Sequence, residues 1–383
     1  KNKFDSSTYW QLEKKLKRLN IKLIKFTNKN LSEESTTINF QNTKLKKFDK
    51  KLFKNKTILV TGAAGSIGKE ICLQLQNTDA KKIIGIDLSE YLIAKFNQNN
   101  YLDNSKIEMI LADVTNIKLL NDIFEKFKPS FIFHAAANKH VDLVENNYKY
   151  SINNNLTGVY NVLKISSKKN YIKKFVFIST DKAIESTNYM GASKMIGEIL
   201  TNYFALKYNK NFSSVRFGNV IGSSGSFLEI IKDQISKGGP ITITDKKASR
   251  YFMTISDAVN LVLHTISFSS QGGTYVLKMG DPINIFDLTK KILSLNNLKI
   301  KDATNPSGDI KIKIIGLKKG EKLHEKLYNK NSKITKTNNT LIDYECPNTI
   351  DKSIVKNILI FCESSEKNHT EKSIKELLSY FKS

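Results

Sequence analysis

The sequence predicts an α/β protein built on a doubly wound, mostly parallel sheet, with a smaller mixed α/β lobe appended to it. From residue 56 onward, short and continuously apolar runs alternate with amphipathic helical stretches. Strands that are apolar on both faces are typical of a parallel sheet covered by helices on both sides. The first run also leads through a glycine-rich turn into a helical stretch, which is typical of doubly wound sheets.

The expected elements follow the chain in a regular order. Six apolar runs are the expected strands: TILVT (57–61), KIIGID (82–87), IEMILAD (107–113), FIFHAAA (131–137), FVFIST (175–180) and SSVRFGNV (213–220). From about residue 221 the chain mixes helices with short strands such as TYVLKM and IKIKIIG, and the smaller lobe is expected to begin there. The main domain, both parts included, is expected to span residues 52–350.

The two ends depart from this pattern. Residues 1–51 are expected to form a linker or accessory segment, with a basic helix and short strand at 9–28 and a polar linker at 29–50. Residues 351–383 are expected to form a helical tail in which a polar stretch precedes the amphipathic helix EKSIKELLSYF. No apolar run is long enough to span a bilayer, and no signal peptide opens the chain. The first residue is Lys rather than Met, which indicates a soluble fragment of a longer protein.

The chain is strongly basic, with a formal net charge of +25. Lysines are spread over its whole length, and no basic stripe is interleaved with aromatic residues, so we expect no nucleic-acid partner. Cys72, Cys346 and Cys362 lie far apart without CxxC spacing. This argues against a zinc site or a disulfide framework and favours a reducing compartment, so we expect no metal.

Arginine is rare in this lysine-rich chain. Of 61 basic residues only Arg18, Arg216 and Arg250 are arginines. An arginine kept where lysine is otherwise used suggests a site that needs a planar two-pronged donor. For Arg18, the alternative interpretation that it has no special role is equally acceptable.

The first chemical motif is TGAAGSIG (61–68), directly after the first expected strand. Its three glycines permit a tight turn, a close approach of the backbone to a pyrophosphate, and close helix–strand packing. The helix that follows offers free N–H groups to phosphates. This Rossmann-type arrangement makes Gly62, Gly65, Ser66, Ile67 and Gly68 the expected contacts of a dinucleotide.

Residues at later strand ends complete the expected cofactor site. Asp87 ends the second strand, where a carboxylate can hold the adenosine ribose hydroxyls and repel a 2′-phosphate, so NAD is favoured over NADP. The alternative is a solvated loop aspartate. The adenine edge is assigned to Asp113 and Val114, and the wall along the dinucleotide to Ala135, Ala136 and Ala137, with Asn155 as a further contact.

The segment STDKAIESTNYMGASK (179–194) lacks a residue that nicotinamide enzymes often use. Lys194 is present, but Met190 stands four residues before it, where a tyrosine base is common. Tyr189 does not replace it, because one residue along a helix rotates the side chain by about 100°. A thioether does not exchange protons, so the acid–base groups must lie elsewhere.

Six motifs together resemble one family. They are GxxGxxG, HAAANKHVDLVE (134–145), STDKAIESTNYMGASK, RFGNVIGSSGS (216–226), SRYFMTISDA (249–258) and GLKKGEKLHEKL (316–327). Their order is similar to that of the UDP-N-acetylglucosamine 4,6-dehydratases of the extended short-chain dehydrogenase/reductase class, in particular the large membrane-anchored polysaccharide-biosynthesis type. The resemblance covers roughly residues 52–345, and residues 9–50 resemble the segment that joins a membrane region to the catalytic domain.

The resemblance implies an internal redox elimination with NAD. Hydride leaves C4 of the sugar, the C5 proton and the C6 hydroxyl are eliminated, and hydride returns to C6. Asp181 is the implied acid for O6 and Lys182 the implied base at C5, with a pKa lowered by burial or by a nearby cation. Thr180 is expected to bond the C4 oxygen and Lys194 the nicotinamide ribose. Outside this motif, Asp181 and Lys182 would be interpreted as an ordinary surface ion pair.

The resemblance also explains the missing tyrosine, since the large members carry Met where Met190 stands. Like them, the protein is expected to retain the configuration at C5 and to give a 4-keto-6-deoxy sugar of D-xylo configuration. The implied substrate-binding residues are Lys139, Asn219, Ser223, Arg250 and Glu321. Arg216 could instead be structural. Lys318 and Lys319 replace an Arg-Pro pair, which removes a planar donor there.

Histidines and alternative functions complete the expectations. His134 and His140 are expected to be packed, hydrogen-bonded residues rather than catalysts. A C5-inverting dehydratase or a UDP-sugar 4-epimerase would share the fold and cofactor, although an epimerase needs no C5 base and normally keeps the tyrosine. A non-catalytic basic binding module is the alternative from another class. We expect a homo-oligomer, and for the full-length protein a place on the cytoplasmic side of the bacterial inner membrane in surface glycan synthesis.

Overall fold

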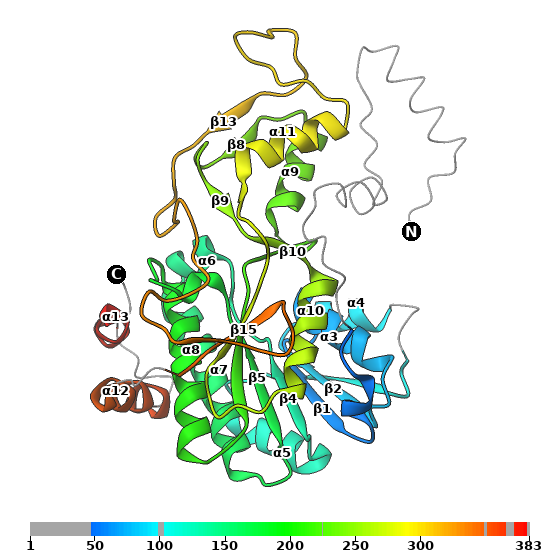
Figure 1. Cartoon of the computed structure of the whole chain (residues 1–383), viewed down its shortest axis with the longest axis vertical. Coiled ribbons are helices and arrows are strands. Elements are labelled where there is room, and N and C mark those ends of the chain that lie inside the picture. Colours follow the sequence, from blue (N-terminus) through cyan, green and yellow to red (C-terminus); the bar gives the residue numbers. More distant parts are fainter. Residues whose placement is uncertain (1–46, 99–102, 224, 348–350, 365–370, 381–383) are drawn as a thin grey trace.

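The computed structural model describes residues 47–98, 103–223, 225–347, 351–364 and 371–380. A large lobe surrounds one central sheet, and a smaller lobe with α9, α11, β8, β9 and β13 lies at one end of it (Figure 1). The basic helix and short strand expected at 9–28 lie outside the described residues, as does most of the expected linker.

Among the described residues, nine strands form the central sheet. Their order is β14 (Ile334–Lys336), β15 (Ile342–Glu345), β11 (Thr274–Leu277), β6 (Phe212–Arg216), β5 (Lys174–Ile178), β4 (Phe131–His134), β1 (Thr57–Thr61), β2 (Lys82–Asp87) and β3 (Ile107–Leu111). The strands from β11 to β3 are parallel, whereas β15 and β14 run antiparallel at one edge. The order 3-2-1-4-5-6 is that of a doubly wound dinucleotide-binding sheet, so the predicted fold class is confirmed.

Helices cover both faces of this sheet. One face packs against α3 (Ser66–Gln76), α4 (Glu90–Asn97) and α10 (Ile255–His264). The other packs against α5 (Ile117–Phe127), α7 (Tyr148–Lys168) and α8 (Tyr189–Lys207). Neighbouring strand residues point to opposite faces, so Ile58 belongs to the first core and Leu59 to the second. Each such fully buried side chain contributes roughly 1.5–3 kcal/mol.

The smaller lobe has an apolar core of its own. It does not take up the whole chain after residue 221 as expected, because TYVLKM contains β11 of the central sheet and the chain returns to that sheet again in β14 and β15. Its elements are β7 (Asn219–Ile221), α9 (Phe227–Ser236), β8 (Ile241–Ile243), β9 (Ser249–Arg250), β10 (Phe252–Thr254), β12 (Ile283–Asn284), α11 (Ile285–Leu295) and β13 (Ile312–Ile314). β8 pairs with β13, β9 with β12, and β7 with β10. Of this last pair, Figure 1 labels β10, which lies between the two lobes.

One predicted strand, 213–220, is divided in two. The chain leaves β6 after Arg216 and begins β7 at Asn219, which pairs with β10 instead of continuing in the large sheet. Gly218 lies at the break, where an added Cβ would be 2.8 Å from Asp181 Oδ2. The absence of a side chain at Gly218 therefore leaves space for the carboxyl group of Asp181.

The C-terminal tail holds two helices, α12 (Lys352–Glu363) and α13 (Glu371–Ser379), and the first of them was not expected. The polar stretch expected before the last helix lies mostly at 365–370, outside the described residues. Asp351 caps α12, and Ile358 and Phe361 are buried in the core that includes α7 and α8. Figure 1 shows both helices on the outer side of α7 and α8. The buried residues Val355, Ile358, Phe361 and Cys362 of this helix follow helical spacing.

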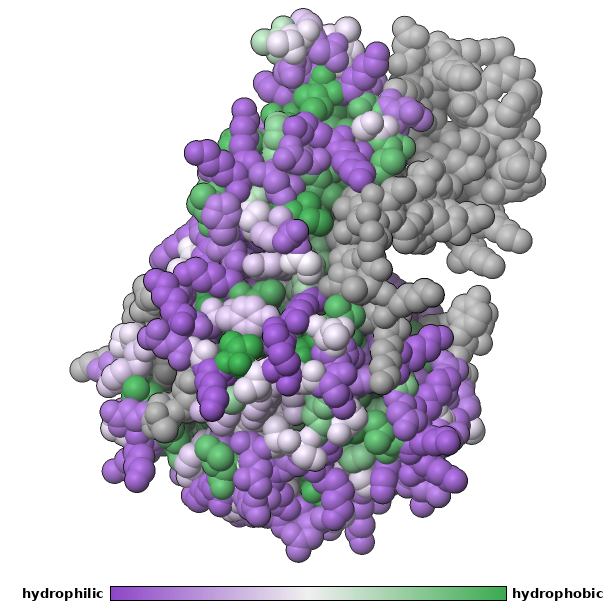
Figure 2. Space-filling model, viewed as in Figure 1, coloured by the Kyte–Doolittle hydropathy of each residue, from purple (hydrophilic) through white to green (hydrophobic). Residues whose placement is uncertain are grey.

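Hydrophilic side chains are spread over both lobes on the face shown in Figure 2, with smaller apolar areas between them. In the described part of the chain, no helix combines the length and the apolar character needed to cross a membrane. Nor does that part contain a group of His, Cys, Asp or Glu side chains suited to a metal ion.

Candidate active site

The glycine-rich turn between β1 and α3 is shaped by close backbone contacts. Gly62 has a φ of +65°, and an added Cβ would lie 2.7 Å from the nitrogen of Ala136. At Gly68 it would lie 2.1 Å from the carbonyl oxygen of Gly62. Gly65 is the N-cap of α3, so Ser66 and Ile67 present first-turn N–H groups beside this turn. The predicted phosphate cradle is thus formed by backbone that no larger residue allows.

Asp87 is held against the same turn. Its Oδ2 accepts a hydrogen bond from the Ala64 nitrogen (3.0 Å) and its Oδ1 one from the Ser89 nitrogen (3.0 Å). Asp113 follows β3 and accepts from the Thr115 nitrogen (2.8 Å). Both carboxylates lie at the carboxyl edge of the sheet, where doubly wound folds bind nucleotides.

The loop after β4 forms the wall next to this turn. The Ala135 nitrogen donates to the Thr61 carbonyl (3.0 Å), and Ala136 approaches Gly62. Ala137 lies in the same loop, while Val114 is buried across from it with its carbonyl bonded to α7. All these predicted cofactor residues therefore lie along one edge of the sheet.

Asn155 supports this loop from α7. Its Nδ2 donates to the Asn138 carbonyl (3.1 Å) and to Ser193 Oγ (3.0 Å), and its Oδ1 accepts from the Asn138 nitrogen (2.8 Å). The sequence interpretation made Asn155 a cofactor contact. In the structure its amide is occupied by protein groups and links α7, α8 and the loop.

Thr180, Asp181 and Lys182 lie at the end of β5, where a short 3-10 helix spans Asp181–Ala183. Asp181 is fully buried, and its Oδ1 accepts from Thr180 Oγ1 (2.9 Å) and Lys182 Nζ (3.0 Å). No hydrogen-bond donor of the described residues reaches its Oδ2. Direct contact of Asp181 with a sugar oxygen was expected, but the carboxyl has no exposed surface.

The Lys182 amine is held from two sides. Besides Asp181, its Nζ donates to Asn219 Oδ1 at 3.0 Å. Burial by itself would lower the pKa of Lys182, but the carboxylates of Asp181 and Glu325 outweigh it and raise the pKa above its ordinary value. The lowered pKa that the sequence led us to expect for Lys182 is therefore wrong, because two buried carboxylates face the amine.

The N-terminal part of α8 carries Met190 and Lys194. Met190 is buried, and Tyr189 stacks on Tyr148 with ring centroids 5.0 Å apart, as expected for a packing residue. Lys194 Nζ donates to the Ile178 carbonyl (2.8 Å). Burial lowers the pKa of Lys194 to about 8, although Glu198 opposes this.

The two histidines differ. His134 is buried, its Nδ1 is 2.8 Å from Thr61 Oγ1, and burial together with the Lys194 charge lowers its pKa to about 3. It is therefore the packed residue that was expected. His140, in contrast, is exposed and lines the cavity described next, so the expectation of packing was wrong there. It precedes α6 (Val141–Asn146), which places it at the cavity wall.

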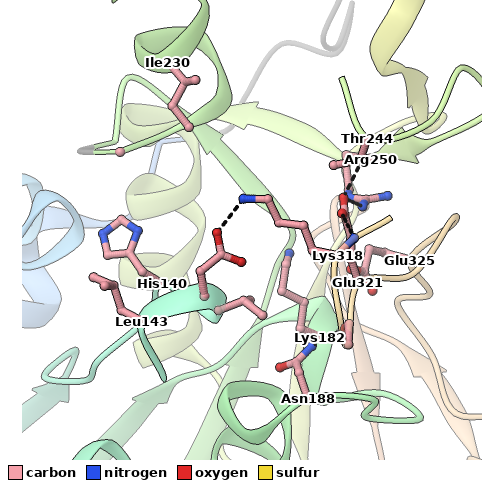
Figure 3. A pocket seen from close by; sticks show the side chains of 14 residues that line it. His140, Leu143, Lys182, Asn188, Ile230, Thr244, Arg250, Lys318, Glu321 and Glu325 are labelled. Atoms are coloured by element: carbon pink, nitrogen blue, oxygen red, sulfur yellow. Dashed lines mark hydrogen bonds and ion pairs between the residues drawn. The ribbon is translucent and has the colours of Figure 1, made fainter. Parts of the chain in front are cut away.

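A cavity of about 480 Å³ lies between the two lobes. Its walls come from α6, the end of β5, the start of α9, the β8–β9 connection and the segment 318–325 (Figure 3). The volume falls within the range of small-molecule sites. Lys182 points into it from the large lobe, and Arg250 and Glu321 face it from the other side (Figure 3).

Arg250 and Glu321 form a pair on this wall. Arg250 Nη2 donates to Glu321 Oε1 (2.7 Å), and its Nη1 donates to the carbonyls of Ser249 (2.7 Å) and Leu323 (3.0 Å). Thr244 Oγ1 also donates to Glu321 Oε1. Arg250, the predicted phosphate donor, thus also fixes the chain around Glu321. All three bonds that Arg250 donates use its Nη1 and Nη2 atoms rather than its Nε.

The other predicted substrate residues have different surroundings. Ser223 Oγ donates to the Val220 carbonyl (3.1 Å) within its own loop. Lys139 directly precedes His140 and is exposed, and burial of its amine nevertheless lowers its pKa, against the opposing effect of Glu229. Lys318 lines the cavity and forms an ion pair with Asp142 of α6 (2.5 Å), so it links the two lobes at the cavity mouth (Figure 3).

Glu325 is a cavity residue that sequence reasoning missed. It is only 8 % exposed and lines the cavity near Lys182 and Arg250. No hydrogen-bond donor of the described residues reaches its Oε2. The signal was present, since Glu325 follows Glu321 by four residues in a motif already singled out.

Arg216, for which a structural role had been left open, lies away from the cavity. Its guanidinium is fully buried between Glu198, with Nη2–Oε2 at 2.6 Å, and Glu345, with Nη1–Oε2 at 2.6 Å. It also donates to the Leu327 carbonyl (2.9 Å). The two arginines of the described chain thus hold the two ends of the segment that carries Glu325.

Comparisons with known proteins agree with this geometry. The model of a family described as polysaccharide biosynthesis protein matches residues 58–344. The capsular polysaccharide biosynthesis protein CapD of Staphylococcus aureus is 43% identical over 281 residues, which are 72% of this chain and 46% of CapD. The chain spans about half the length of such relatives.

Shorter relatives and a solved structure match over most of their length. A UDP-glucose 4-epimerase of Rickettsia bellii is 32% identical over 72% of this chain and 78% of its own. A UDP-N-acetylglucosamine 4,6-dehydratase (inverting) of Campylobacter jejuni is 31% identical over 72% of this chain and 78% of its own. The structure of Pen from Bacillus thuringiensis superposes with a TM-score of 0.69 at 31% identity, over 78% of this chain and 90% of Pen.

Proposed function

Since the chain belongs to the polysaccharide biosynthesis protein family, we propose that it is an NAD-dependent UDP-N-acetylglucosamine 4,6-dehydratase that retains the configuration at C5. The observation that carries the proposal is the pair of Asp181 and Lys182 at the end of β5, with the amine facing a cavity. An acid–base pair beside Met190, which exchanges no protons, suits an elimination better than an epimerisation.

The residues around the glycine-rich turn fit NAD. The positive φ of Gly62 and the contact at Gly68 leave backbone space for a pyrophosphate, and Asp87 is available to ribose hydroxyls. Lys194 Nζ donates to the carbonyl of Ile178, the last residue of β5, so its amine lies at the carboxyl edge of the sheet, where it would hold the nicotinamide ribose. When bound, NAD would accept a hydride from C4 and return it to C6.

The proton transfers fall to the Asp181–Lys182 pair. In the charged pair the Lys182 amine holds a proton that can pass over 3.0 Å to Asp181. This leaves a neutral amine, which removes the proton from C5 and later returns it to C5, and a protonated carboxyl, whose proton leaves with the C6 oxygen as water. The proton that O4 loses on oxidation brings the pair back to its starting charge. Because Asp181 is covered, its proton reaches O6 by way of Lys182 or after this amine has moved.

The diphosphate and the sugar would occupy the cavity. Arg250 lies on its wall as a charged donor, and Lys318 stands at its mouth. Asn219 holds the Lys182 amine, so its amide supports the base as well as the substrate. Thr180 remains the proposed partner of the C4 oxygen once its bond to Asp181 is exchanged.

The experiment that tests the proposal is incubation of the purified protein with UDP-N-acetylglucosamine and, in parallel, UDP-N-acetylgalactosamine. We expect mass spectrometry to show loss of one water from the first sugar nucleotide. An isomer of unchanged mass would establish the epimerase alternative instead. Salt-sensitive nucleic-acid binding without turnover would favour the binding module. Oligomerisation and membrane attachment of a longer protein stay predictions.

A further inference from the structure

The segment that carries Glu325 is fixed at both ends. Arg250 donates to the Leu323 carbonyl (3.0 Å), and Arg216 donates to the Leu327 carbonyl (2.9 Å). The Ser249 nitrogen also donates to the Leu323 carbonyl (3.0 Å). The backbone on either side of Glu325 therefore has little freedom, and its carboxyl is held at the cavity.

The carboxyl of Glu325 is costly to bury as it stands. Its side chain is only 4 % exposed, and no hydrogen-bond donor of the described residues reaches Oε2. Lys322 Nζ is 3.7 Å from that atom, which is an ion-pair distance but too long for a hydrogen bond. A buried carboxylate oxygen without a hydrogen bond is destabilising, and a role in catalysis is one of the reasons for which such a group is kept.

The charged groups that face Glu325 come from three parts of the chain: Asp181 and Lys182 after β5, Arg250 of β9, and Lys322 of its own segment. Burial and the Asp181 charge raise the pKa of Glu325, although the three cations oppose this. The effect is mutual, because the Glu325 carboxylate is one of two that raise the pKa of Lys182. The other is Asp181, the proposed acid.

We propose that Glu325 is a positioning residue for the proposed elimination: in its ionised form, the carboxylate held in the cavity wall is a second negative charge, besides Asp181, that stabilises the protonated Lys182 amine. The proposal rests on the function given above, and it adds a third charged group to the Asp181–Lys182 pair. No contact between Glu325 and substrate is required for this role.

The physical step is a proton shift within the cluster. Lys182 becomes a base when its proton passes to Asp181 or to solvent, and a nearby carboxylate disfavours this loss. If Glu325 is neutral, the positive amine loses one of its two stabilising charges. The amine is then deprotonated at lower pH.

The test is the pH profile of kcat for the native enzyme and for Glu325→Gln. The rising limb reports deprotonation of the base, so we expect it to lie roughly one pH unit lower in Glu325→Gln. Glu325→Asp keeps the charge, so its limb should remain near the native position even if its rate falls. Glu321→Gln removes a carboxylate from the same wall and should change KM while leaving the limb in place.

A second measurement does not depend on turnover. Trace acetylation across a pH series, read by peptide mass spectrometry, reports when Lys182 is neutral, with the exposed Lys237 as internal control. In Glu325→Gln, the labelling curve of Lys182 should move to lower pH while that of Lys237 stays. If Glu325→Gln does not fold, Glu325→Ala supplies the neutral side chain.

The outcomes separate the two proposals. A protein that does not dehydrate the sugar nucleotide refutes the proposed function, whereas the labelling curve still decides the role of Glu325. If the Lys182 labelling curves coincide for charged and neutral side chains at position 325, the charge of Glu325 has no effect on Lys182, which overturns the inference. A limb of the pH profile that shifts equally in Glu325→Asp also overturns it, because the shape of the side chain rather than its charge would then be responsible.

Discussion

Two clusters of buried charge lie beside neighbouring strands of the sheet, and they differ in how completely they are satisfied. In the first, Arg216 of β6 is enclosed by Glu198 of α8 and Glu345 of β15. Every carboxylate oxygen of this cluster accepts a hydrogen bond, with Ser179, Asn329 and Ser332 supplying the remaining donors. The guanidinium does not line the cavity, so this cluster has a structural role: it joins α8, β6 and β15 and holds the Leu327 carbonyl.

The second cluster consists of Asp181, Lys182 and Glu325, and it is left incomplete. Asp181 Oδ2 and Glu325 Oε2 receive no hydrogen bond from the described residues, and the Lys182 amine opens onto the cavity. The contrast shows how a structural cluster of buried charges can be distinguished from a functional one. A closed network of charges stabilises the fold, whereas an open one keeps unused acid and base capacity for a ligand.

The largest expected effect on folding comes from breaking the closed cluster. Arg216→Ala leaves two carboxylates buried and unpaired, which should cost about 3–5 kcal/mol of unfolding free energy. Urea denaturation followed by circular dichroism measures it. Lys182→Ala is the matched comparison and should change the midpoint much less, because its cluster borders the cavity. Equal losses of stability would remove the distinction between the clusters.

The largest expected effect on activity comes from breaking the open cluster. Lys182→Ala removes the proposed base and should lower kcat by about 10²–10⁴-fold, while NAD and UDP-sugar still bind. Turnover by mass spectrometry and binding by calorimetry separate the two effects. Lys326→Ala, which removes an exposed amine paired with Glu185, is the control and should be fully active. A fully active Lys182→Ala protein would exclude this lysine as the base.

A smaller effect is expected at Arg250, which has two roles. It anchors the backbone at Leu323, and it lies on the cavity wall as a hydrogen-bond donor. Arg250→Lys keeps the charge but loses the planar donor, so UDP-sugar binding should weaken by about 1.5–3 kcal/mol. Calorimetry with the UDP-sugar gives the dissociation constant, and the thermal midpoint reports the lost bond to Leu323. An unchanged dissociation constant would leave Arg250 with the anchoring role alone.

The smallest expected effect concerns the cofactor, far from either cluster. NAD should bind more tightly than NADP, and Asp87→Ala should narrow the difference, because the carboxylate that repels a 2′-phosphate is removed. Cofactor titration followed by fluorescence quenching measures both constants. Asn116→Ala, which alters only the cap of α5, should leave the ratio unchanged. Tighter NADP binding by the native protein would contradict the assignment.

The sheet and the cofactor side could be predicted because their determinants are local. Continuous apolar runs specified the strands from β1 to β6, and the glycines of 61–68 require their turn whatever surrounds them. The tail could not be predicted equally well, since the short apolar run of α12 fits a strand as well as a helix, and its buried face packs in the same core as α7 and α8.

The substrate side was harder because its charges come from distant segments. The sequence motifs identified Lys182, Arg250 and Glu321 as site residues. They did not show that Asp181 is fully buried or that the Glu325 carboxylate raises the pKa of Lys182. Those facts depend on how the segment 318–325 crosses the cavity, which is set by Arg216 and Arg250 together. Spacing along the chain does not contain that information.

The measurement that tests the central claim most directly follows the reaction of UDP-N-acetylglucosamine with the native protein in deuterated water by proton NMR and mass spectrometry. If the open cluster removes and returns the C5 proton, the product has lost one water, carries deuterium at C5 and has the D-xylo configuration. An L-arabino product would contradict retention at C5. A product of unchanged mass, or one with no deuterium at C5, would contradict the role of Lys182 and its neighbours in proton transfer.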